Sequence, residues 1–282
     1  MNVFLTGASG YVGHHCMHEL LDAGHTVSAL SRRDTNPAID GVTWIKGSLE
    51  TLNTNQFAAS EVIIHCAMGY ENGAEASDVD DAAMKILRAS GKFVVTTGNM
   101  YTCSTDPSGH FDEALETAPA NWRNVAEQKL LDIAAGGASI RLGFVYGGTG
   151  GYFWMVFAPD EDGNVLYCGD NNSWPMAHVS DVARLFRLVA EQRATGIFHA
   201  FDGQATPVET MVKIASTHQG GTPKKVAHKV AHARLGAFAN HMMRTIQPKA
   251  GNTAALGWLP EHPSFEGAAA EAFRDYKAHQ QA

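Results

Sequence analysis

Three glycines near the start of the chain have the spacing of a loop that binds phosphate groups. They follow the apolar run Asn2–Thr6 and overlap a helical pattern that begins at Tyr11. The first glycine permits a tight turn out of a strand, the second lets backbone N–H groups approach a pyrophosphate, and the third lets the helix pack closely on the strand. The helix N-terminus adds the positive end of a dipole. The predicted contacts to a dinucleotide are Gly7, Ser9, Gly10, Tyr11, Val12 and Gly13.

The residues after the second apolar run, Thr26–Leu30, distinguish between the two nicotinamide dinucleotides. A carboxylate at this point would bind the ribose 2′-hydroxyl of NAD. The chain instead has Ser31, Arg32 and Arg33, and two guanidinium groups can bind a 2′-phosphate through charge-assisted hydrogen bonds. Asp34 comes too late in the turn to take the place of that carboxylate. We therefore predict NADP(H) rather than NAD, the alternative being that one or both arginines are solvated loop charges.

The elements that must position these residues alternate between apolar strands and amphipathic helices. The expected strands are Asn2–Thr6, Thr26–Leu30, Val42–Ile45, Glu61–Cys66, Lys92–Thr96, Ala138–Leu142 and Gly196–Ala200. The expected helices are Tyr11–Ala23, Ala74–Ser90, Asn121–Ala135 and Val179–Gln192. Apolar strands that alternate with helices are typical of a parallel sheet covered on both faces. The pattern predicts an α/β protein with a Rossmann-type doubly wound parallel sheet.

The second half of the chain is less regular, and helices dominate from Pro207 onward. We expect an NADP-binding domain over residues 1–150 and a smaller, mostly helical substrate lobe over residues 151–282. Segments around residues 177–203 are expected to return to the sheet.

Two segments of this lobe have distinctive compositions. The aromatic run Tyr152–Phe157 either lines a cleft for an apolar or aromatic small molecule or packs between the lobes. Residues 210–260 include several lysines and arginines but no aspartate or glutamate. This segment predicts either a positive surface for an anionic substrate or partner, or an ordinary solvated helix face.

The composition excludes several classes of protein. The chain has 282 residues, a formal net charge of -8 and 45% hydrophobic residues, which argues against a nucleic-acid or membrane-surface partner. No apolar run is long enough for a transmembrane helix, and the N-terminus lacks the basic leader of a signal peptide. The four cysteines form no CxxC pair and the histidine pairs have no evident third ligand, so we expect free thiols and no metal site. A cytoplasmic protein is expected.

Six segments within residues 1–203 match, in order, the motifs of one family. They are Thr6–Gly13, Gly47–Leu49, Val62–Ala67, Phe93–Thr97, Arg141–Gly147 and Ala177–Ala183. They resemble the extended and atypical short-chain dehydrogenase/reductases, the NAD(P)-dependent epimerase/dehydratase-like group. The resemblance implies further cofactor contacts from Ser48, Leu49, Cys66, Ala67, Met68, Leu142 and Val145. Ser48 stands where the family has aspartate. The resemblance also implies a small-molecule substrate and a monomer or homodimer.

The chain departs from this family at the residues that carry its chemistry. The family uses a Tyr-x-x-x-Lys pair on the helix after the fifth strand, where the phenol is the acid/base and the lysine lowers its pKa and binds the nicotinamide ribose. No Tyr-x-x-x-Lys occurs in this sequence. In one alignment Pro119 and Arg123 take the two positions, and in the other Trp122 and Ala126 do. Arg123 can still hold a ribose or phosphate, but it stays charged and relays protons poorly.

The candidates to supply the missing chemistry follow the fifth strand and are Thr97, Asn99 and Tyr101. Thr97, also an expected cofactor contact, or its neighbour Gly98 lies at the family's Ser/Thr position. Tyr101 can present a phenol, as Tyr70 or Tyr146 can from neighbouring strand ends. Ligands gather at the carboxyl ends of strands in open α/β sheets, where all these residues are expected. The alternative is that the tyrosines pack or cap loops.

The sequence supports three functions. The favoured one is an NADPH-dependent oxidoreductase that reduces a carbonyl or activated double bond of a small hydrophobic substrate by hydride transfer, with a non-standard proton donor or water. The second is a catalytically silent NADP-binding redox sensor or regulatory protein, which the absence of the Tyr/Lys pair motivates. The third is a nucleotide-sugar epimerase or dehydratase, whose chemistry depends most on the absent tyrosine.

Overall fold

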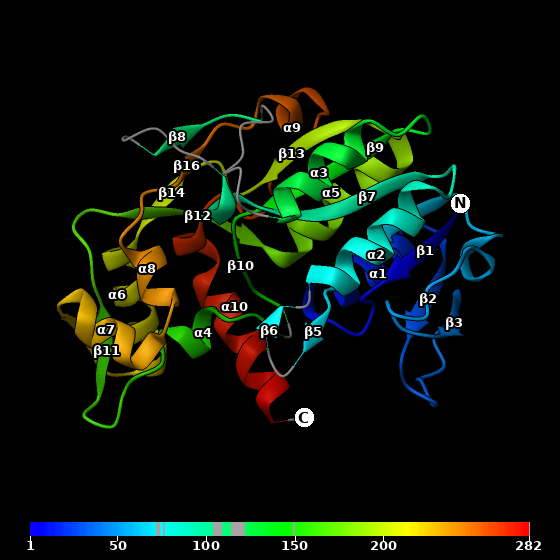
Figure 1. Ribbon diagram of the computed structural model, residues 1–282. Coiled ribbons are helices and arrows are strands. Elements are labelled where there is room, and N and C mark those ends of the chain that lie inside the picture. Colours follow the sequence, from blue (N-terminus) through cyan, green and yellow to red (C-terminus); the bar gives the residue numbers. More distant parts are fainter. Residues whose placement is uncertain (72–73, 76, 104–108, 114–121, 149, 282) are drawn as a thin grey trace.

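A seven-stranded parallel sheet is the largest layer of the molecule (Figure 1). The computed structural model describes residues 1–71, 74–75, 77–103, 109–113, 122–148 and 150–281. In sheet order the strands are β13 (Gly196–Ala200), β9 (Gly137–Leu142), β7 (Phe93–Asn99), β4 (Val62–His65), β1 (Asn2–Thr6), β2 (Thr26–Ser31) and β3 (Val42–Lys46). The strand order reverses between β1 and β4, and such a reversal leaves a crevice at the carboxyl ends of the strands.

Helices cover both faces of this sheet because its strands are apolar on both sides. On β1, Val3 and Leu5 pack with α1 (Tyr11–Asp22) and α5 (Val179–Gln192). Phe4 belongs to the opposite face, whose apolar cluster includes residues of α2 (Ser77–Arg88) and α3 (Trp122–Leu131). Alternate residues of one strand thus reach different layers, as the pleat of a strand requires.

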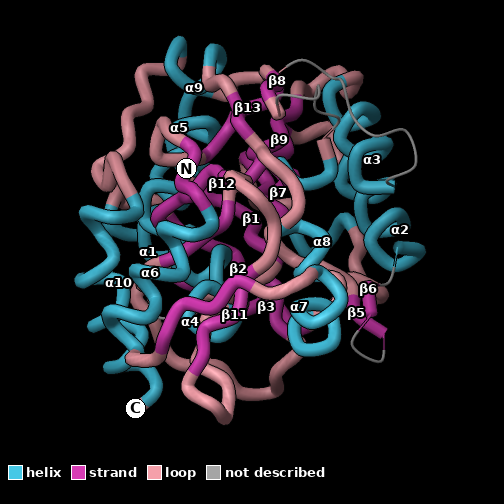
Figure 2. The backbone as a smooth tube through the Cα atoms, turned by 90° about the vertical axis from the view of Figure 1, so that its left-hand side faces the viewer, coloured by secondary structure: helices cyan, strands magenta, loops and turns pink. Residues whose placement is uncertain are grey.

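The second half of the chain builds a separate cluster beside the sheet. Figure 1 places its elements α6, α7, α8 and β11 at the left, away from β1, β2 and β3, and Figure 2 views the molecule from the side of α6, α7 and α8. The helices are α4 (Phe153–Val156), α6 (Val208–Gln219), α7 (His228–Leu235), α8 (Phe238–Met242), α9 (Gly251–Ala255) and α10 (Phe265–Gln280). The short strands from the second half are β10 (Phe144–Tyr146), β11 (Asn164–Tyr167), β12 (Ser173–His178), β14 (Ala205–Pro207), β15 (Thr222–Lys225) and β16 (Gln247–Pro248). One strand of the first half, β8 (His110–Phe111), pairs with β16.

The aromatic run after β10 divides between the core and the surface. Phe153, Trp154 and Phe157 are buried in the apolar cluster of this half, together with Trp174. Tyr152 is 68% exposed, and Met155 is also exposed. Packing therefore accounts for most of the run, and Tyr152 remains available to a ligand.

The seven expected strands are those of the sheet, which confirms the predicted Rossmann-type fold. The segment around residues 177–203 supplies α5 and β13 to it. The helix expected from Ala74 begins later, at Ser77, because residues 70–71 and 74–75 pair as β5 (Tyr70–Glu71) and β6 (Ala74–Glu75). Two single turns, η1 (Thr54–Phe57) and η2 (Met100–Thr102), were not expected.

In the described part of the chain, every helix is too short or too polar to cross a membrane.

Candidate functional site

A cleft of about 750 Å³ runs along the carboxyl edge of the sheet and reaches the second half of the chain. The sheet and its loops contribute Gly7, Ser9, Gly10, Tyr11, Val12, Gly13, Leu30, Arg32, Gly47, Ser48, Leu49, Glu50, Cys66, Ala67, Met68, Gly69, Thr97, Gly98, Asn99 and Tyr101. Later segments contribute Leu142, Gly143, Phe144, Val145, Tyr152, Phe238 and His241. Most of the residues expected from the sequence to bind a cofactor thus lie along one cavity.

The glycine loop is too tight for side chains at two of its three positions. Gly7 has a φ of +78°, and a Cβ there would lie 2.7 Å from the backbone nitrogen of Ala67. A Cβ on Gly13 would lie 2.1 Å from the carbonyl oxygen of Gly7. Gly10 is less constrained, because a Cβ placed on it would meet one atom, the carbonyl oxygen of Gly7, at 3.2 Å. Gly7 and Gly13 therefore serve the turn, and Gly10 keeps the space above the loop open.

The first turn of α1 faces this space without a cap from its own chain. Gly10 is the N-cap and offers no side-chain hydrogen bond, and the first turn contains no acidic residue. The first N–H groups of a helix lack partners within the helix, so they are available to an anion. The Tyr11 hydroxyl donates to the carbonyl oxygen of Gly147 at 2.6 Å and fixes the opposite wall.

One of the two expected guanidinium groups reaches the cleft. Arg32 lines it, whereas the exposed Arg33 does not. The Ser31 hydroxyl is also turned aside, because it donates to the side chain of Asn36 at 2.7 Å. Asp34 forms a salt bridge with Lys46 at 2.6 Å, so this carboxylate has a partner within the turn.

Glu50 is a carboxylate at this end of the cleft that the sequence did not single out. A hydrogen bond from Ser48 lowers its pKa, and its own backbone N–H and the charge of Arg32 act in the same direction. Glu50 therefore stays ionised near Arg32, within the segment expected to contact adenine.

The opposite end of the cleft is aromatic. Phe144 of β10, Tyr152 and Phe238 of α8 line it together with Tyr101 and His241. No sequence motif marks Phe238 or His241, and they join the site because α8 packs beside β10 and β12. Tyr146, a candidate phenol, is fully buried and contacts Phe265 instead of lining the cleft. The side chain of Tyr70 lies outside the described residues.

Tyr101 lines this end of the cleft, and its hydroxyl is buried. Its backbone N–H donates to the Asn99 side chain at 2.8 Å, which holds the turn that follows β7. The Tyr101 hydroxyl oxygen is buried and has no hydrogen-bond partner among the residues that the structure describes. Burial raises the pKa of Tyr101 well above its usual value, so the phenol stays protonated.

Residues 3–105 match the sequence model of the NAD dependent epimerase/dehydratase family. A protein of Streptomyces named 3-diazoavenalumate denitrifying reductase is 26% identical over 94% of this chain and 98% of its own length. An uncharacterised protein of Schizosaccharomyces pombe is 28% identical over 94% of this chain and 97% of its own length.

Solved structures of the epimerase group share the fold. MoeE5 in complex with UDP-glucuronic acid and NAD has a TM-score of 0.78 and 22% identity, and the match covers 99% of both chains. The human epimerase family protein SDR39U1, solved with NADPH, has a TM-score of 0.68 and 16% identity, and the match covers 98% of this chain and 100% of that one.

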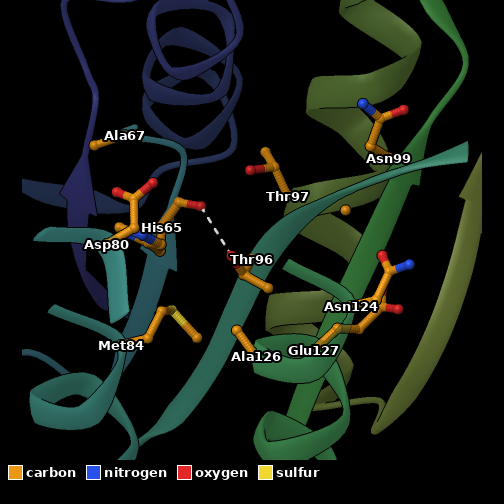
Figure 3. Close-up of a pocket in the computed structure, with 11 residues that line it drawn as sticks. His65, Ala67, Asp80, Met84, Thr96, Thr97, Asn99, Asn124, Ala126 and Glu127 are labelled. Atoms are coloured by element: carbon orange, nitrogen blue, oxygen red, sulfur yellow. Dashed lines mark hydrogen bonds between the residues drawn. The ribbon is translucent and has the colours of Figure 1, made fainter. Parts of the chain in front are cut away.

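The helix on which the family places its Tyr/Lys pair here borders a polar recess of about 30 Å³, roughly the size of one water molecule. Figure 3 shows Asn124 and Glu127 on one side of it, His65 and Asp80 on the other, and Thr97 between them. Glu127 bridges to the guanidinium of Arg141 at 2.7 Å, and both side chains are buried. The described inward face of α3 thus carries an amide and a paired carboxylate. Pro119 and the side chains of Trp122 and Arg123 lie outside the described residues.

A second polar cluster joins the two halves away from the cleft. His178, Asp181 and His262 come close enough to be metal ligands. The Asp181 carboxylate already accepts bonds from the Arg184 side chain at 2.8 Å, the Glu261 N–H at 2.8 Å and the His262 N–H at 3.0 Å. It also pairs with the His262 ring at 2.9 Å. Because donors surround Asp181, the cluster acts as a clamp between α5 and the segment before α10.

The segment without acidic residues does not form an unbroken positive surface. Lys213 pairs with Glu209, and Lys225 pairs with Asp170, both from outside residues 210–260. Arg244 donates to the carbonyl oxygens of Tyr101 and Cys103. Several of these cations therefore have structural partners.

Proposed function

We propose that this protein is an NADPH-dependent reductase that acts on a carbonyl or activated double bond of a small aromatic or apolar molecule. One observation carries the proposal. A single cleft joins the glycine loop and Arg32 at one end to an aromatic wall that includes Tyr101 at the other. A volume of about 750 Å³ falls in the range of small-molecule and cofactor sites.

The residues at the first end fit a phosphorylated dinucleotide. The uncapped first turn of α1 suits a pyrophosphate, and Gly10 leaves space for it. The Arg32 carbonyl oxygen accepts from Lys46, whereas its guanidinium has no hydrogen bond or salt bridge with the described residues, so the guanidinium is available to a 2′-phosphate. One structural neighbour was solved with NADPH and another with NAD, and Arg32 is our reason to favour the phosphorylated form.

The chemistry requires a hydride, a proton and a positioned substrate. When bound, the nicotinamide supplies the hydride. Thr97 and Asn99 lie at the end of β7, between the two ends of the cleft, and orient the groups that meet there. The Tyr101 hydroxyl donates its proton to the substrate atom that gains the electron pair. Its protonated state suits this role, because a phenol is a stronger acid than the alcohol it forms.

The aromatic end indicates the substrate class. Phe144, Tyr152 and Phe238 can pack against a planar ring, with Tyr152 at the mouth. The name of the Streptomyces relative, 3-diazoavenalumate denitrifying reductase, supports a reductive activity for this kind of chain.

Two measurements test the proposal. Isothermal titration calorimetry should detect tighter binding of NADPH than of NADH. Loss of nicotinamide absorbance should then report turnover with a panel of aromatic aldehydes, ketones, enones and aryl diazo compounds. Binding of neither dinucleotide by folded protein would overturn the proposal.

A silent NADP-binding protein is the second candidate, because the sequence has no Tyr-x-x-x-Lys. Tight NADPH binding without turnover of any compound in the panel would favour it over the reductase.

A further inference from the structure

His241 lies beside Tyr101 at the substrate end of the cleft, although 140 residues separate them in the sequence. Their rings meet edge to face, with centroids 5.3 Å apart and an interplanar angle of 77°. Both side chains line the cleft. A phenol from the sheet and an imidazole from the second half therefore border the same space.

Tyr101 is held firmly from several directions. Arg244 donates to its carbonyl oxygen at 2.6 Å, and its N–H donates to Asn99 at 2.8 Å. Its ring meets Trp174 edge to face at 5.6 Å. The backbone and ring are thus fixed, and the buried hydroxyl lacks a partner among the described residues. A buried hydroxyl without a partner is costly, and a ligand in the cleft would supply the missing partner.

His241 is likewise held in place and has a buried polar atom without a partner among the described residues. Trp174 donates from Nε1 to the carbonyl oxygen of His241 at 3.1 Å, which ties α8 to β12. The ring nitrogen Nδ1 is buried and has no hydrogen-bond partner in the described part of the chain. Burial, and secondarily the charge of Arg244, lowers the pKa of His241, so the ring is neutral near pH 7 and one of its nitrogens carries a hydrogen.

We propose that His241 is a second catalytic residue, which donates a hydrogen bond to the same substrate atom that Tyr101 protonates. This inference rests on the reductase proposed above. The hydride forms a C–H bond at the substrate carbon, the π electrons of the C=O bond move to oxygen, and that oxygen takes the proton of the Tyr101 hydroxyl. His241 stabilises the negative charge on oxygen and stays neutral. The Tyr101 phenolate then takes a proton from water that enters the cleft.

Tyr101 and His241 differ from the family's Tyr/Lys pair because neither of them carries the permanent positive charge of a lysine. Neither ring supplies a fixed cation beside the phenol, so the phenolate needed to remove a proton from an alcohol is scarce. The protonated Tyr101 is therefore ready to donate its proton in the direction of reduction.

The first test uses steady-state kinetics on the full chain, with the best substrate of the panel. His241→Leu removes the donor, His241→Gln keeps an amide N–H, and Tyr101→Phe removes the proton. We expect kcat to fall roughly 100-fold or more for Tyr101→Phe and roughly 10- to 1000-fold for His241→Leu. His241→Gln should recover much of the loss. His232→Leu, an exposed histidine of α7 outside the cleft, is the matched control.

The second test does not require turnover. In the presence of NADP⁺, 4-nitrophenolate serves as an oxyanion probe whose absorbance reports binding and ionisation. We expect binding roughly 10-fold or more weaker in both His241→Leu and Tyr101→Phe, because each loses a hydrogen bond to a charged oxygen. NADPH affinity should be unchanged in both variants.

These readouts separate the two proposals. If NADPH binds but nothing in the panel is reduced, the reductase is wrong, and the nitrophenolate titration still decides whether His241 and Tyr101 share one oxygen site. Wild-type kcat in His241→Leu, or wild-type nitrophenolate affinity in that variant, would overturn the inference. Loss of NADPH binding in His241→Leu would also contradict it, because that loss indicates a structural role.

Discussion

Arg32 and Arg33 are adjacent in the sequence, but the structure gives them different surroundings. Arg32 lines the cleft beside Glu50, and Arg33 is exposed outside it. Both side chains carry the same charge. Only an arginine that lines the cleft can reach a 2′-phosphate bound there, so the position of the side chain decides which of the two can bind it.

Arg32→Ala should weaken NADPH binding roughly 10- to 100-fold, because a charge-assisted hydrogen bond to the 2′-phosphate is lost. NADH lacks that phosphate, and its affinity should change little. Calorimetry with both dinucleotides measures the difference, and Arg33→Ala is the matched control. An equal loss of NADPH affinity in Arg33→Ala would show that the cleft-facing arginine is not the selective one.

Gly10 and Gly13 allow the loop and its ligand to be tested separately. Gly13→Ala places a Cβ 2.1 Å from the Gly7 oxygen, so thermal unfolding should occur at a clearly lower temperature. Gly10→Ala meets the same oxygen at 3.2 Å, a contact that a small shift relieves. We expect Gly10→Ala to unfold near the wild-type temperature but to lose NADPH affinity, because the methyl group occupies the space of the pyrophosphate. Unaltered NADPH binding in Gly10→Ala would mean that the phosphate lies elsewhere.

At the scale of elements, α3 keeps its place beside the sheet although it lacks the family's catalytic pair. Glu127 of α3 and Arg141 of β9 form a buried salt bridge. The Arg141 Nε donates to both carboxylate oxygens of Glu127, and Arg141 Nη2 donates to Glu127 Oε2. A Cβ on Gly98 would lie 2.8 Å from Glu127 Oε1, so the carboxylate also packs against β7. This face of α3 stabilises the floor of the cleft.

Glu127→Gln should lower the free energy of unfolding by about 3–5 kcal/mol, because it leaves a buried guanidinium without the Glu127 carboxylate. Urea denaturation at pH 7 measures the change. Lys85→Ala breaks an exposed pair with Asp81 on α2 and should cost under about 1 kcal/mol. Equal stability losses in the two variants would argue against a structural role for the buried pair.

At the scale of the whole molecule, two halves of the chain share one cleft, and Asp181 links them away from it. Burial alone would raise the pKa of this carboxyl, but bonds from Arg184, Glu261 and His262 outweigh it and lower the pKa. A folded-state pKa below the unfolded value stabilises the fold above the unfolded pKa of about 4. This contribution is lost as the pH falls through the folded pKa.

Asp181→Asn should therefore destabilise the protein by about 1–3 kcal/mol at pH 7, and the difference from wild type should shrink below about pH 4. Urea denaturation between about pH 3 and about pH 7 measures both effects. Asp202 titrates at the upper end of this range, because burial raises its pKa to about 7 and the charge of Asp181 adds to the rise. Asp34→Asn is the control and should show a smaller pH dependence, because its pair with Lys46 is exposed to solvent. A constant difference between Asp181→Asn and wild type across this range would contradict the assigned pKa direction.

The sequence by itself determined the sheet and the glycine-loop end of the cleft. Both depend on patterns local to the chain, namely apolar strands of period two, helical spacing and glycines at fixed offsets. The boundary at Ala74 was missed because strands of two residues carry too few positions for a periodic signal.

The tertiary structure alone decided which candidates meet. It turned Arg32 toward the cleft, buried Tyr146, left Tyr152 exposed and brought His241 to Tyr101. These outcomes depend on contacts between residues far apart in the chain. Periodicity records which face of an element is apolar, but it does not record which distant element will cover that face.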